Sequence, residues 1–167
     1  ANVVVIGAGN VGYNAAWIAA GMLANVTILD KNLDRLRHLD QICVGRTSTL
    51  ASNRGSIERA LVDADLVVGA VLVAGARAPI VVSEDMVRSM KPGSVIVDVA
   101  VDQGGCIATT RETTHTDPIY MQHGVVHYAV GNMPGAVPYT STYSLTNATL
   151  PYQLDVARLG ALGAVTQ

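Results

Sequence analysis

The chain has 167 residues, of which 50% are hydrophobic and only 14% charged, and its formal net charge is −2 at pH 7. This length suits one domain with a sizeable core, and the charge gives no reason to expect binding to nucleic acid. No apolar run reaches the length of a membrane span, and two cysteines are too few for a disulfide scaffold, so we expect a cytoplasmic protein without a membrane partner.

Short apolar runs alternate with helical stretches along the chain. Strands are expected at residues 3–6, 25–30, 46–50, 65–72, 94–100 and 124–130. Helices are expected at residues 10–23, 32–43, 56–64, 83–91 and 141–160, the last interrupted at Pro151. Residues 101–123 and 132–141 lack periodicity and are expected to be long loops. The alternation predicts an α/β fold, a three-layer αβα Rossmann-type doubly wound parallel sheet of about six strands.

Local signals indicate where two helices begin and which face of a third is buried. Ser56 and Ser83 are the expected N-caps of the third and fourth helices, and Pro92 and Gly93 follow the fourth. The second helix is amphipathic. Its buried face is expected to hold Leu33, Leu36, Leu39 and either Ile42 or Cys43.

A glycine-rich turn joins the first expected strand to the first expected helix. The sequence GAGNVG, residues 7–12, matches G-x-G-x-x-G in the context that this pattern requires. Gly7 permits a tight turn, Gly9 lets a pyrophosphate approach the backbone, and Gly12 lets the helix pack close to the strand. The helix N-terminus offers N–H groups and a positive dipole end to phosphates. The turn therefore predicts a dinucleotide-binding site.

An acidic residue, Asp30, ends the second expected strand. Its carboxylate can accept hydrogen bonds from the adenosine ribose hydroxyls and would repel a 2′-phosphate, which favours NAD over NADP as the cofactor. The alternative is that Asp30 only caps the helix that begins near Asn32. Arg35 could serve a 2′-phosphate or could be a solvated helix residue.

The stretch VDVAVDQGGC, residues 97–106, places Asp98 among the last residues of the fifth expected strand and Asp102 just beyond it, before a glycine pair. Ligands in open α/β sheets bind beyond the carboxyl ends of the strands, and Asp102 lies there. Its carboxylate could orient a water or ammonia and exchange protons with an amine. It could equally cap the glycine turn, and the residues alone leave both interpretations open.

The histidines and Cys106 give weaker signals. His38 is expected to be solvated, His115 and His123 fall in the long loop, and His127 is expected to be a satisfied core residue. None has an acid or cysteine at metal-ligand spacing, so we expect no metal. Cys106 is expected to be an inert small hydrophobe.

Four segments together resemble the NAD-binding domain of the alanine dehydrogenases. They are GAGNVGYNAA, VTILDKNLDRLRHLD, the stretch from ADLVVGAVL to VDQGGC, and the stretch from TTHTDPIY to TNATLPY. Proton-translocating NAD(P) transhydrogenases have a related domain, but DQGG and NMPGAVP favour the dehydrogenase. One departure is Asn10, where the family usually has an apolar residue, and backbone contacts to the pyrophosphate should tolerate it.

This resemblance implies NAD-dependent oxidative deamination of L-alanine to pyruvate and ammonium, and the reverse reaction. It implies that Asp102 is the catalytic acid. The residues that it implies for cofactor binding are Gly7, Gly9, Asn10, Val11, Gly12, Asp30, Arg35, Ser52, Val71, Leu72, Val99, Asn132 and Met133.

The resemblance also implies a domain organisation. Residues 1–137 would form the NAD-binding domain, and residues 138–167 a helical segment that leads toward an absent domain holding most of the substrate contacts. We therefore expect a piece of a homo-oligomeric enzyme, such as a hexamer, that lacks turnover by itself. The rival interpretations are a transhydrogenase domain and a stand-alone dinucleotide-binding module.

Overall fold

The computed structural model describes residues 1–43, 45–73 and 75–165. Within them strands and helices alternate along most of the chain. Their bounds are β1 (Asn2–Ile6), α1 (Asn10–Gly21), β2 (Asn25–Asp30), α2 (Leu33–Cys43), β3 (Thr47–Ala51), α3 (Arg54–Val62), β4 (Leu66–Gly69), α4 (Glu84–Arg88), β5 (Val95–Asp98), the 3₁₀ helix η1 (Val101–Gln103), β6 (Ile119–Gln122), β7 (Val125–Tyr128), the 3₁₀ helix η2 (Met133–Ala136) and α5 (Pro138–Val165).

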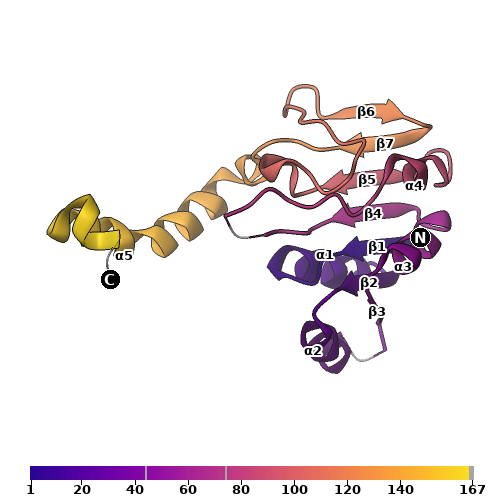
Figure 1. Ribbon diagram of the computed structural model, residues 1–167, viewed down its shortest axis with the longest axis horizontal. Coiled ribbons are helices and arrows are strands. Elements are labelled where there is room, and N and C mark those ends of the chain that lie inside the picture. Colours follow the sequence, from indigo (N-terminus) through magenta and orange to yellow (C-terminus); the bar gives the residue numbers. More distant parts are fainter. Residues whose placement is uncertain (44, 74, 166–167) are drawn as a thin grey trace. The chain divides into compact units, whose positions relative to one another are not determined.

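The described strands form one sheet in the order β3-β2-β1-β4-β5-β7-β6 (Figure 1). All neighbouring pairs are parallel except β6 and β7, which are antiparallel. The chain begins in the middle at β1, extends to β2 and β3 on one side, and then returns to β4 on the other side. This confirms the predicted doubly wound α/β fold. A crevice for ligands is expected where the strand order reverses, at the carboxyl ends of β1 and β4.

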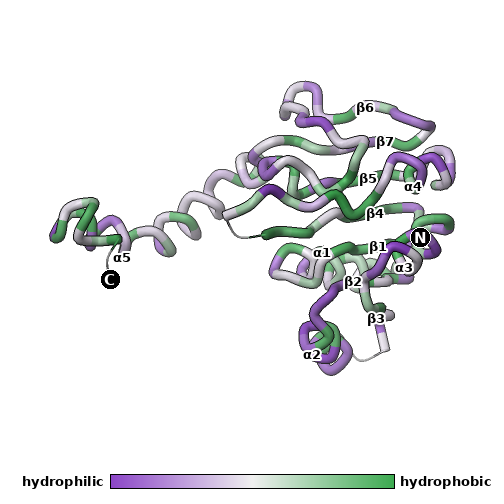
Figure 2. The backbone as a smooth tube through the Cα atoms, in the orientation of Figure 1, coloured by the Kyte–Doolittle hydropathy of each residue, from purple (hydrophilic) through white to green (hydrophobic). Residues whose placement is uncertain are grey.

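The central strand β1 is apolar on both faces because helices cover both sides of the sheet. Val4 and Ile6 belong to one hydrophobic cluster, which also contains buried residues of α3 and α4. Val3 and Val5 belong to a second cluster, with buried residues of α1 and α2. Figure 2 shows the contrast between hydrophobic β1 and mostly hydrophilic α2. Continuous apolar strands of this kind are typical of a parallel sheet covered on both faces.

The prediction that Ser56 is an N-cap is wrong. The N-cap of α3 is Asn53, whose side chain accepts a hydrogen bond from the Ser56 N–H at 2.9 Å, while the Ser56 hydroxyl accepts one from the Asn53 N–H at 3.0 Å. Ser56 therefore takes the third helical position of a capping box, where Glu or Gln is usual. The prediction for Ser83 is confirmed, because its side chain accepts from the Met86 N–H at 3.4 Å.

The buried face of α2 differs from the prediction at Leu33. Of the two alternatives Ile42 and Cys43, the structure buries Cys43. Leu36, Leu39 and Cys43 are buried, but Leu33 is 51% exposed and Ile42 38% exposed. Leu33 is the first residue of the helix. Helical spacing places a residue on a face, but it does not say how far the covering sheet extends.

The predicted loop at residues 101–123 contains a seventh strand, β6, that the sequence analysis missed. β6 is a short strand whose Ile119 and Met121 are exposed. The ring of Tyr120 stacks on His127 of β7 at 4.9 Å. His127 is fully buried, and its ring nitrogens lie 2.8 Å from Thr109 Oγ1 and 3.0 Å from the Val125 carbonyl oxygen, which confirms the satisfied core histidine. Burial lowers the pKa of His127, which keeps its ring neutral.

The helix α5 runs through Pro151, so the predicted interruption there is wrong. Proline lacks one N–H donor and crowds the carbonyl of the preceding turn, but these costs do not end this helix. The non-helical backbone lies at Gly160 instead, with φ 71° and ψ 167°. Glycine adopts this conformation without steric cost.

Residue contacts divide the chain into two compact units, Ala1–Gly131 and Asn132–Gln167. The predicted domain boundary after residue 137 stays a prediction.

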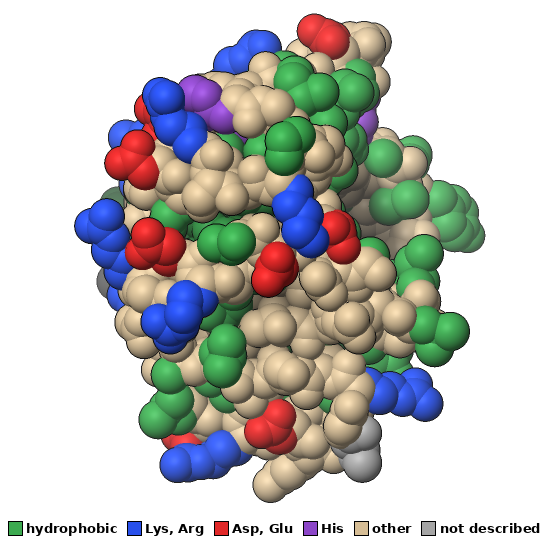
Figure 3. Space-filling view, turned by 90° about the vertical axis from the view of Figure 1, so that its right-hand side faces the viewer, with side chains coloured by type: hydrophobic (Ala, Val, Ile, Leu, Met, Phe, Trp, Pro, Cys, Tyr) green, Lys and Arg blue, Asp and Glu red, His purple; other side chains and the backbone are tan. Residues whose placement is uncertain are grey.

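Among the residues that the structure describes, no helix is both long and apolar enough to cross a membrane. On the face at the right of Figure 1, basic and acidic side chains are interspersed (Figure 3). That face therefore presents no extended field of a single sign.

Candidate functional site

A groove of about 990 Å³ lies in the unit Ala1–Gly131, at the carboxyl ends of β1, β2 and β4. It is therefore in the crevice where the strand order reverses. Most of the predicted cofactor residues come together along it. Those that line it are Gly7, Gly9, Asn10, Val11, Asp30, Arg35, Ser52, Val71 and Leu72.

The three glycines of the GAGNVG turn have different surroundings. Gly7 has φ +105°, and a Cβ there would lie 2.5 Å from the Ala70 carbonyl oxygen. A Cβ on Gly12 would overlap the Gly7 carbonyl oxygen, so α1 packs directly against the turn. A Cβ on Gly9 would have only Arg35 Nη1 nearby, at 4.0 Å. Gly7 and Gly12 thus shape the turn, and Gly9 leaves its backbone open to the groove.

The N-terminus of α1 opens onto the same groove. Its N-cap is Gly9, which makes no side-chain capping bond, and the first turn holds no acidic residue. The first amides of the helix therefore keep their N–H groups for a ligand, and the helix dipole favours a negative one. The glycine turn and this helix end fit a pyrophosphate.

Asp30 ends β2 beside the glycine turn. Its Oδ2 accepts a hydrogen bond from the Ala8 N–H at 2.6 Å, and its Oδ1 accepts one from the Asn32 N–H at 2.7 Å. The N-cap of α2 is Asn32, whose side chain accepts from the N–H groups of Asp34 and Arg35 at 3.0 and 3.1 Å. The alternative that Asp30 itself caps the helix is therefore not what the structure shows.

The cationic side chain of Arg35 lies near Asp30 in the groove. Arg35 Nη1 is 4.0 Å from Asp30 Oδ2 and the Arg35 side chain is 58% exposed, and Lys31 and His38 also line the groove. The Ser52 N–H donates to the Asp30 carbonyl oxygen at 2.9 Å, which holds the end of β3 against β2. The sequence analysis missed Lys31, although its position directly after Asp30 was a usable signal.

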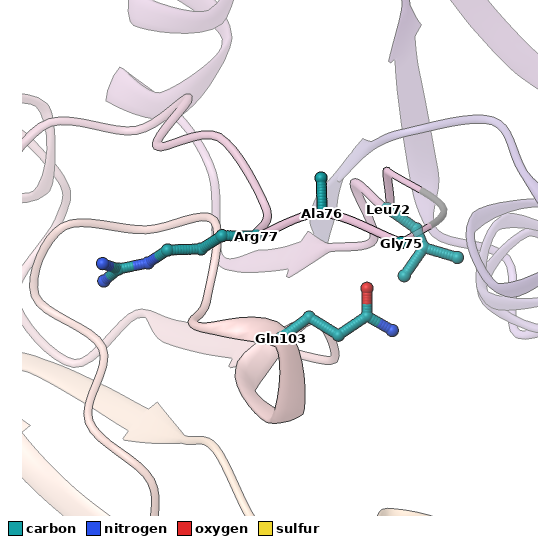
Figure 4. Close-up of a pocket in the computed structure, with 5 residues that line it drawn as sticks. All are labelled: Leu72, Gly75, Ala76, Arg77 and Gln103. Carbon is teal, nitrogen blue, oxygen red and sulfur yellow. The ribbon is translucent and has the colours of Figure 1, made fainter.

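A second, smaller pocket of about 360 Å³ lies beyond Leu72. It is lined by Leu72, Gly75, Ala76, Arg77 and Gln103. Figure 4 shows the Gln103 side chain pointing from η1 toward the loop that carries Leu72 and Gly75, whereas the Arg77 guanidinium points away from it. The two segments are joined by a hydrogen bond from the Ala78 N–H to the Gln103 carbonyl oxygen at 2.9 Å. This pocket therefore shares Leu72 with the groove and Gln103 with the turn that carries Asp102.

Asp98 holds the backbone of the glycine turn that follows β5. Asp98 is fully buried, and its carboxylate accepts from the N–H groups of Ala100, Cys106 and Ile107 at 3.1, 2.9 and 3.2 Å. Asp102 lies in η1, just beyond the carboxyl end of β5, and is exposed. The turn that Asp98 organises therefore presents Asp102 at the surface.

Four of the predicted cofactor residues do not line the groove. Gly12 is buried behind the glycine turn. Val99 packs against the hydrophobic cluster of α1 and α2. Asn132, with a left-handed φ of 54°, and Met133, in η2, belong to the unit Asn132–Gln167.

The remaining candidates carry little chemistry. Cys106 is fully buried, which confirms the expectation of an inert side chain, and burial with the nearby Asp98 carboxylate raises its pKa to about 12. His38 is exposed, as expected. No group of three or more His, Cys, Asp and Glu residues within the described parts of the chain could hold a metal ion.

Comparison with known proteins gives concordant matches. The family model described as "Alanine dehydrogenase/PNT, C-terminal domain" matches residues 1–167. An alanine dehydrogenase from Staphylococcus haemolyticus is 59% identical over 157 residues, which are 93% of this chain and 42% of that protein. The solved structure of an L-alanine dehydrogenase has a TM-score of 0.88 and 52% identity, over 99% of this chain and 45% of that one. A transhydrogenase from Sinorhizobium meliloti has a TM-score of 0.76 and 26% identity, over 86% of this chain and 40% of that one. The chain thus spans less than half the length of these proteins.

Proposed function

Because the chain belongs to the alanine dehydrogenase/PNT C-terminal domain family, we propose that it is the NAD-binding part of an L-alanine dehydrogenase. The observation that carries this proposal is the groove, since it collects the glycine turn, the α1 N-terminus and Asp30 at one strand edge. The pyrophosphate would lie on the turn and the helix N-terminus, and Asp30 and Ser52 would lie at the adenosine end. Leu72 would lie along the cofactor toward the turn that carries Asp102.

NAD is the proposed cofactor, in preference to NADP. The Asp30 carboxylate would repel a 2′-phosphate and can accept hydrogen bonds from ribose hydroxyls. The cations Lys31 and Arg35 would attract a 2′-phosphate and so favour NADP. The Asp30 carboxylate is less exposed than they are, with 12% of its side chain accessible. Charges are less screened where water is scarce, so the acid should decide the preference.

The proposed reaction of the whole protein is the oxidation of L-alanine. The Cα–H bond breaks, water takes the place of the nitrogen, and pyruvate, ammonium and one proton are released. The nicotinamide ring, when bound, supplies the acceptor for the hydride. Asp102 would orient the water or the departing nitrogen and exchange protons with it. Residues outside this chain would hold most of the substrate, so this chain alone is proposed to bind the cofactor without turnover.

The setting of the whole protein is also a proposal. We propose a cytoplasmic homo-oligomer, such as a hexamer. Met133 and Asn132 would complete the nicotinamide side, and Val99 and Gly12 would support the site from the core. A second candidate is the NAD(H)-binding domain of a transhydrogenase, which the structural similarity at 26% identity supports, although the similarity at 52% identity favours the dehydrogenase.

A calorimetric titration of the chain with NADH, and with NADPH beside it, tests the proposed cofactor. We expect NADH to bind at least roughly fivefold more tightly than NADPH, because one unfavourable charge contact costs on the order of 1 kcal/mol or more. Equal binding of both would contradict the role of Asp30. Binding of neither would contradict a complete site within this chain.

Asp102→Asn in a full-length protein that carries this domain tests the proposed reaction. We expect kcat for alanine oxidation to fall by roughly 10²–10⁴, as for the loss of a general acid–base group, with NADH affinity unchanged. Asp117→Asn, which changes another exposed acid, is the control. Wild-type kcat in Asp102→Asn would remove this residue from the mechanism. Hydride exchange between NADH and an NADP analogue, with no response to alanine, would favour the transhydrogenase instead.

A further inference from the structure

Both carboxylate oxygens of Asp30 are engaged by backbone amides. The bonds from the N–H groups of Ala8 and Asn32 are short, at 2.6 and 2.7 Å, and only 12% of the Asp30 side chain is exposed. Hydrogen bonds to an ionised carboxylate are about twice as strong as neutral ones. A contact between Asp30 and ribose hydroxyls would not by itself require these two backbone hydrogen bonds.

The bond to Ala8 holds the glycine turn in place. Ala8 lies between Gly7, which makes the tight bend, and Gly9, which leaves its backbone open to the groove. The Gly7 N–H donates to the Leu29 carbonyl oxygen at 2.7 Å. The N–H groups of two successive turn residues therefore donate to two successive residues at the end of β2. The first acceptor is the Leu29 backbone carbonyl, and the second is the Asp30 side chain.

The bond to Asn32 extends the same arrangement to α2. Asn32 accepts from the first amides of that helix, including that of Arg35, whose guanidinium returns to within 4.0 Å of Asp30 Oδ2. One carboxylate thus links the phosphate-facing turn and the first turn of α2. Each carboxylate oxygen keeps a further lone pair that a ribose hydroxyl can use.

We infer that Asp30 is a positioning residue for the glycine turn, in addition to the ribose contact that the proposed function gives it. The Asp30 carboxylate accepts a hydrogen bond from the Ala8 N–H. It thereby sets the position of the next residue, Gly9, whose backbone is open to the groove. Removal of Asp30 therefore does more than relieve repulsion of a 2′-phosphate. It loosens the turn on which any dinucleotide rests, so NADPH gains little from the change.

Amide hydrogen exchange, measured by NMR on the chain without added nucleotide, tests the positioning role by itself. In Asp30→Ala we expect the Ala8 amide to exchange on the order of tenfold faster or more, since it loses a bond to a charged acceptor. The Gly7 amide, bonded to a backbone carbonyl, should keep its protection and serves as the internal control. Asp34→Ala removes an exposed acid of α2 and should change neither amide. If Ala8 exchanges in Asp30→Ala as in the wild type, the inference is overturned.

A ligand series separates this role from the ribose contact, and this arm rests on the proposed function. The chain and its Asp30→Ala variant are titrated with NADH and with an NADH analogue that lacks both adenosine ribose hydroxyls. If Asp30 acts only through these hydroxyls, the variant binds the analogue as tightly as the wild type does, which would overturn the inference. We expect the variant to bind the analogue severalfold more weakly. If the wild type binds neither ligand, the proposed function fails, while the exchange experiment still decides the positioning role.

Asp30→Asn covers the case in which the alanine variant does not fold. Its single carbonyl oxygen can accept from Ala8 or from Asn32 but not from both in the present geometry. We expect faster exchange at one of these two amides with Gly7 still protected. Wild-type exchange at both amides would overturn the inference.

Discussion

Gly12→Ala is expected to lower the free energy of unfolding by about 3 kcal/mol, at the upper end of the cost of overpacking. The added Cβ would overlap the Gly7 carbonyl oxygen and lie 2.9 Å from the Gly7 carbonyl carbon and 3.2 Å from Val5 Cγ1. Two of these atoms are backbone, so α1 would have to move away from the end of β1. Urea unfolding followed by circular dichroism measures the change, and NADH titration should show that binding is lost with it.

Two other glycines provide matched controls for this prediction. Gly21→Ala changes the same helix where no atom lies within 4 Å of the new Cβ, and should leave stability unchanged or raise it by up to about 1 kcal/mol. Gly9→Ala should keep wild-type stability, because its Cβ meets only Arg35 at 4.0 Å, but should weaken NADH binding by blocking the approach of the pyrophosphate. Wild-type stability in Gly12→Ala, or equal losses in Gly12→Ala and Gly21→Ala, would contradict the proposed packing.

Asp98→Ala is expected to cost about 4 kcal/mol of stability. Three backbone N–H groups lose their acceptor, and each buried donor left without a partner costs roughly 1–3 kcal/mol. The thiol of Cys106, which donates to Asp98 Oδ1 at 3.4 Å, loses its acceptor as well. Chemical denaturation at neutral pH measures the loss.

The size of this effect should depend on how many acceptors remain. Asp98→Asn keeps one carbonyl oxygen of similar shape, so it should be destabilised less than Asp98→Ala. Asp117→Ala, at an exposed acid, should stay within about 0.5 kcal/mol of the wild type. A loss in Asp98→Ala no larger than in Asp117→Ala would show that the turn after β5 does not depend on this carboxylate.

Several features of the protein are encoded locally, and the sequence predicted them well. The glycine turn, the apolar strands beside it and the cap at Ser83 each depend on residues a few positions apart. Alternation of strands and helices restricts the topology further, since a parallel sheet needs its crossovers. The resemblance of four segments to the alanine dehydrogenases agreed with the family to which the chain belongs.

Other features escaped local reasoning because they depend on contacts between distant segments. β6 is short and half exposed, and it forms a strand only because β7 offers it an edge to pair with. The sequence places Asp98 at the end of the fifth expected strand and Asp102 beyond it, but only the folded turn shows that Asp98 accepts from three backbone amides while Asp102 is exposed. Proline is a helix breaker on average, yet α5 continues through Pro151.

The doubly wound fold, the nature of the glycine turn and the position of the acid that ends β2 could all be predicted without the structure. These follow from periodicity, from the conformational freedom of glycine and from the order of the elements. Three features became visible only in the folded protein: the Asp30 carboxylate holds the glycine turn, Val71 and Leu72 line the same groove as Asp30 and Ser52, and Asp98 supports the turn of Asp102. Hydrogen-bond partners and cavity walls come from residues far apart in the chain, and no local pattern specifies which of them meet.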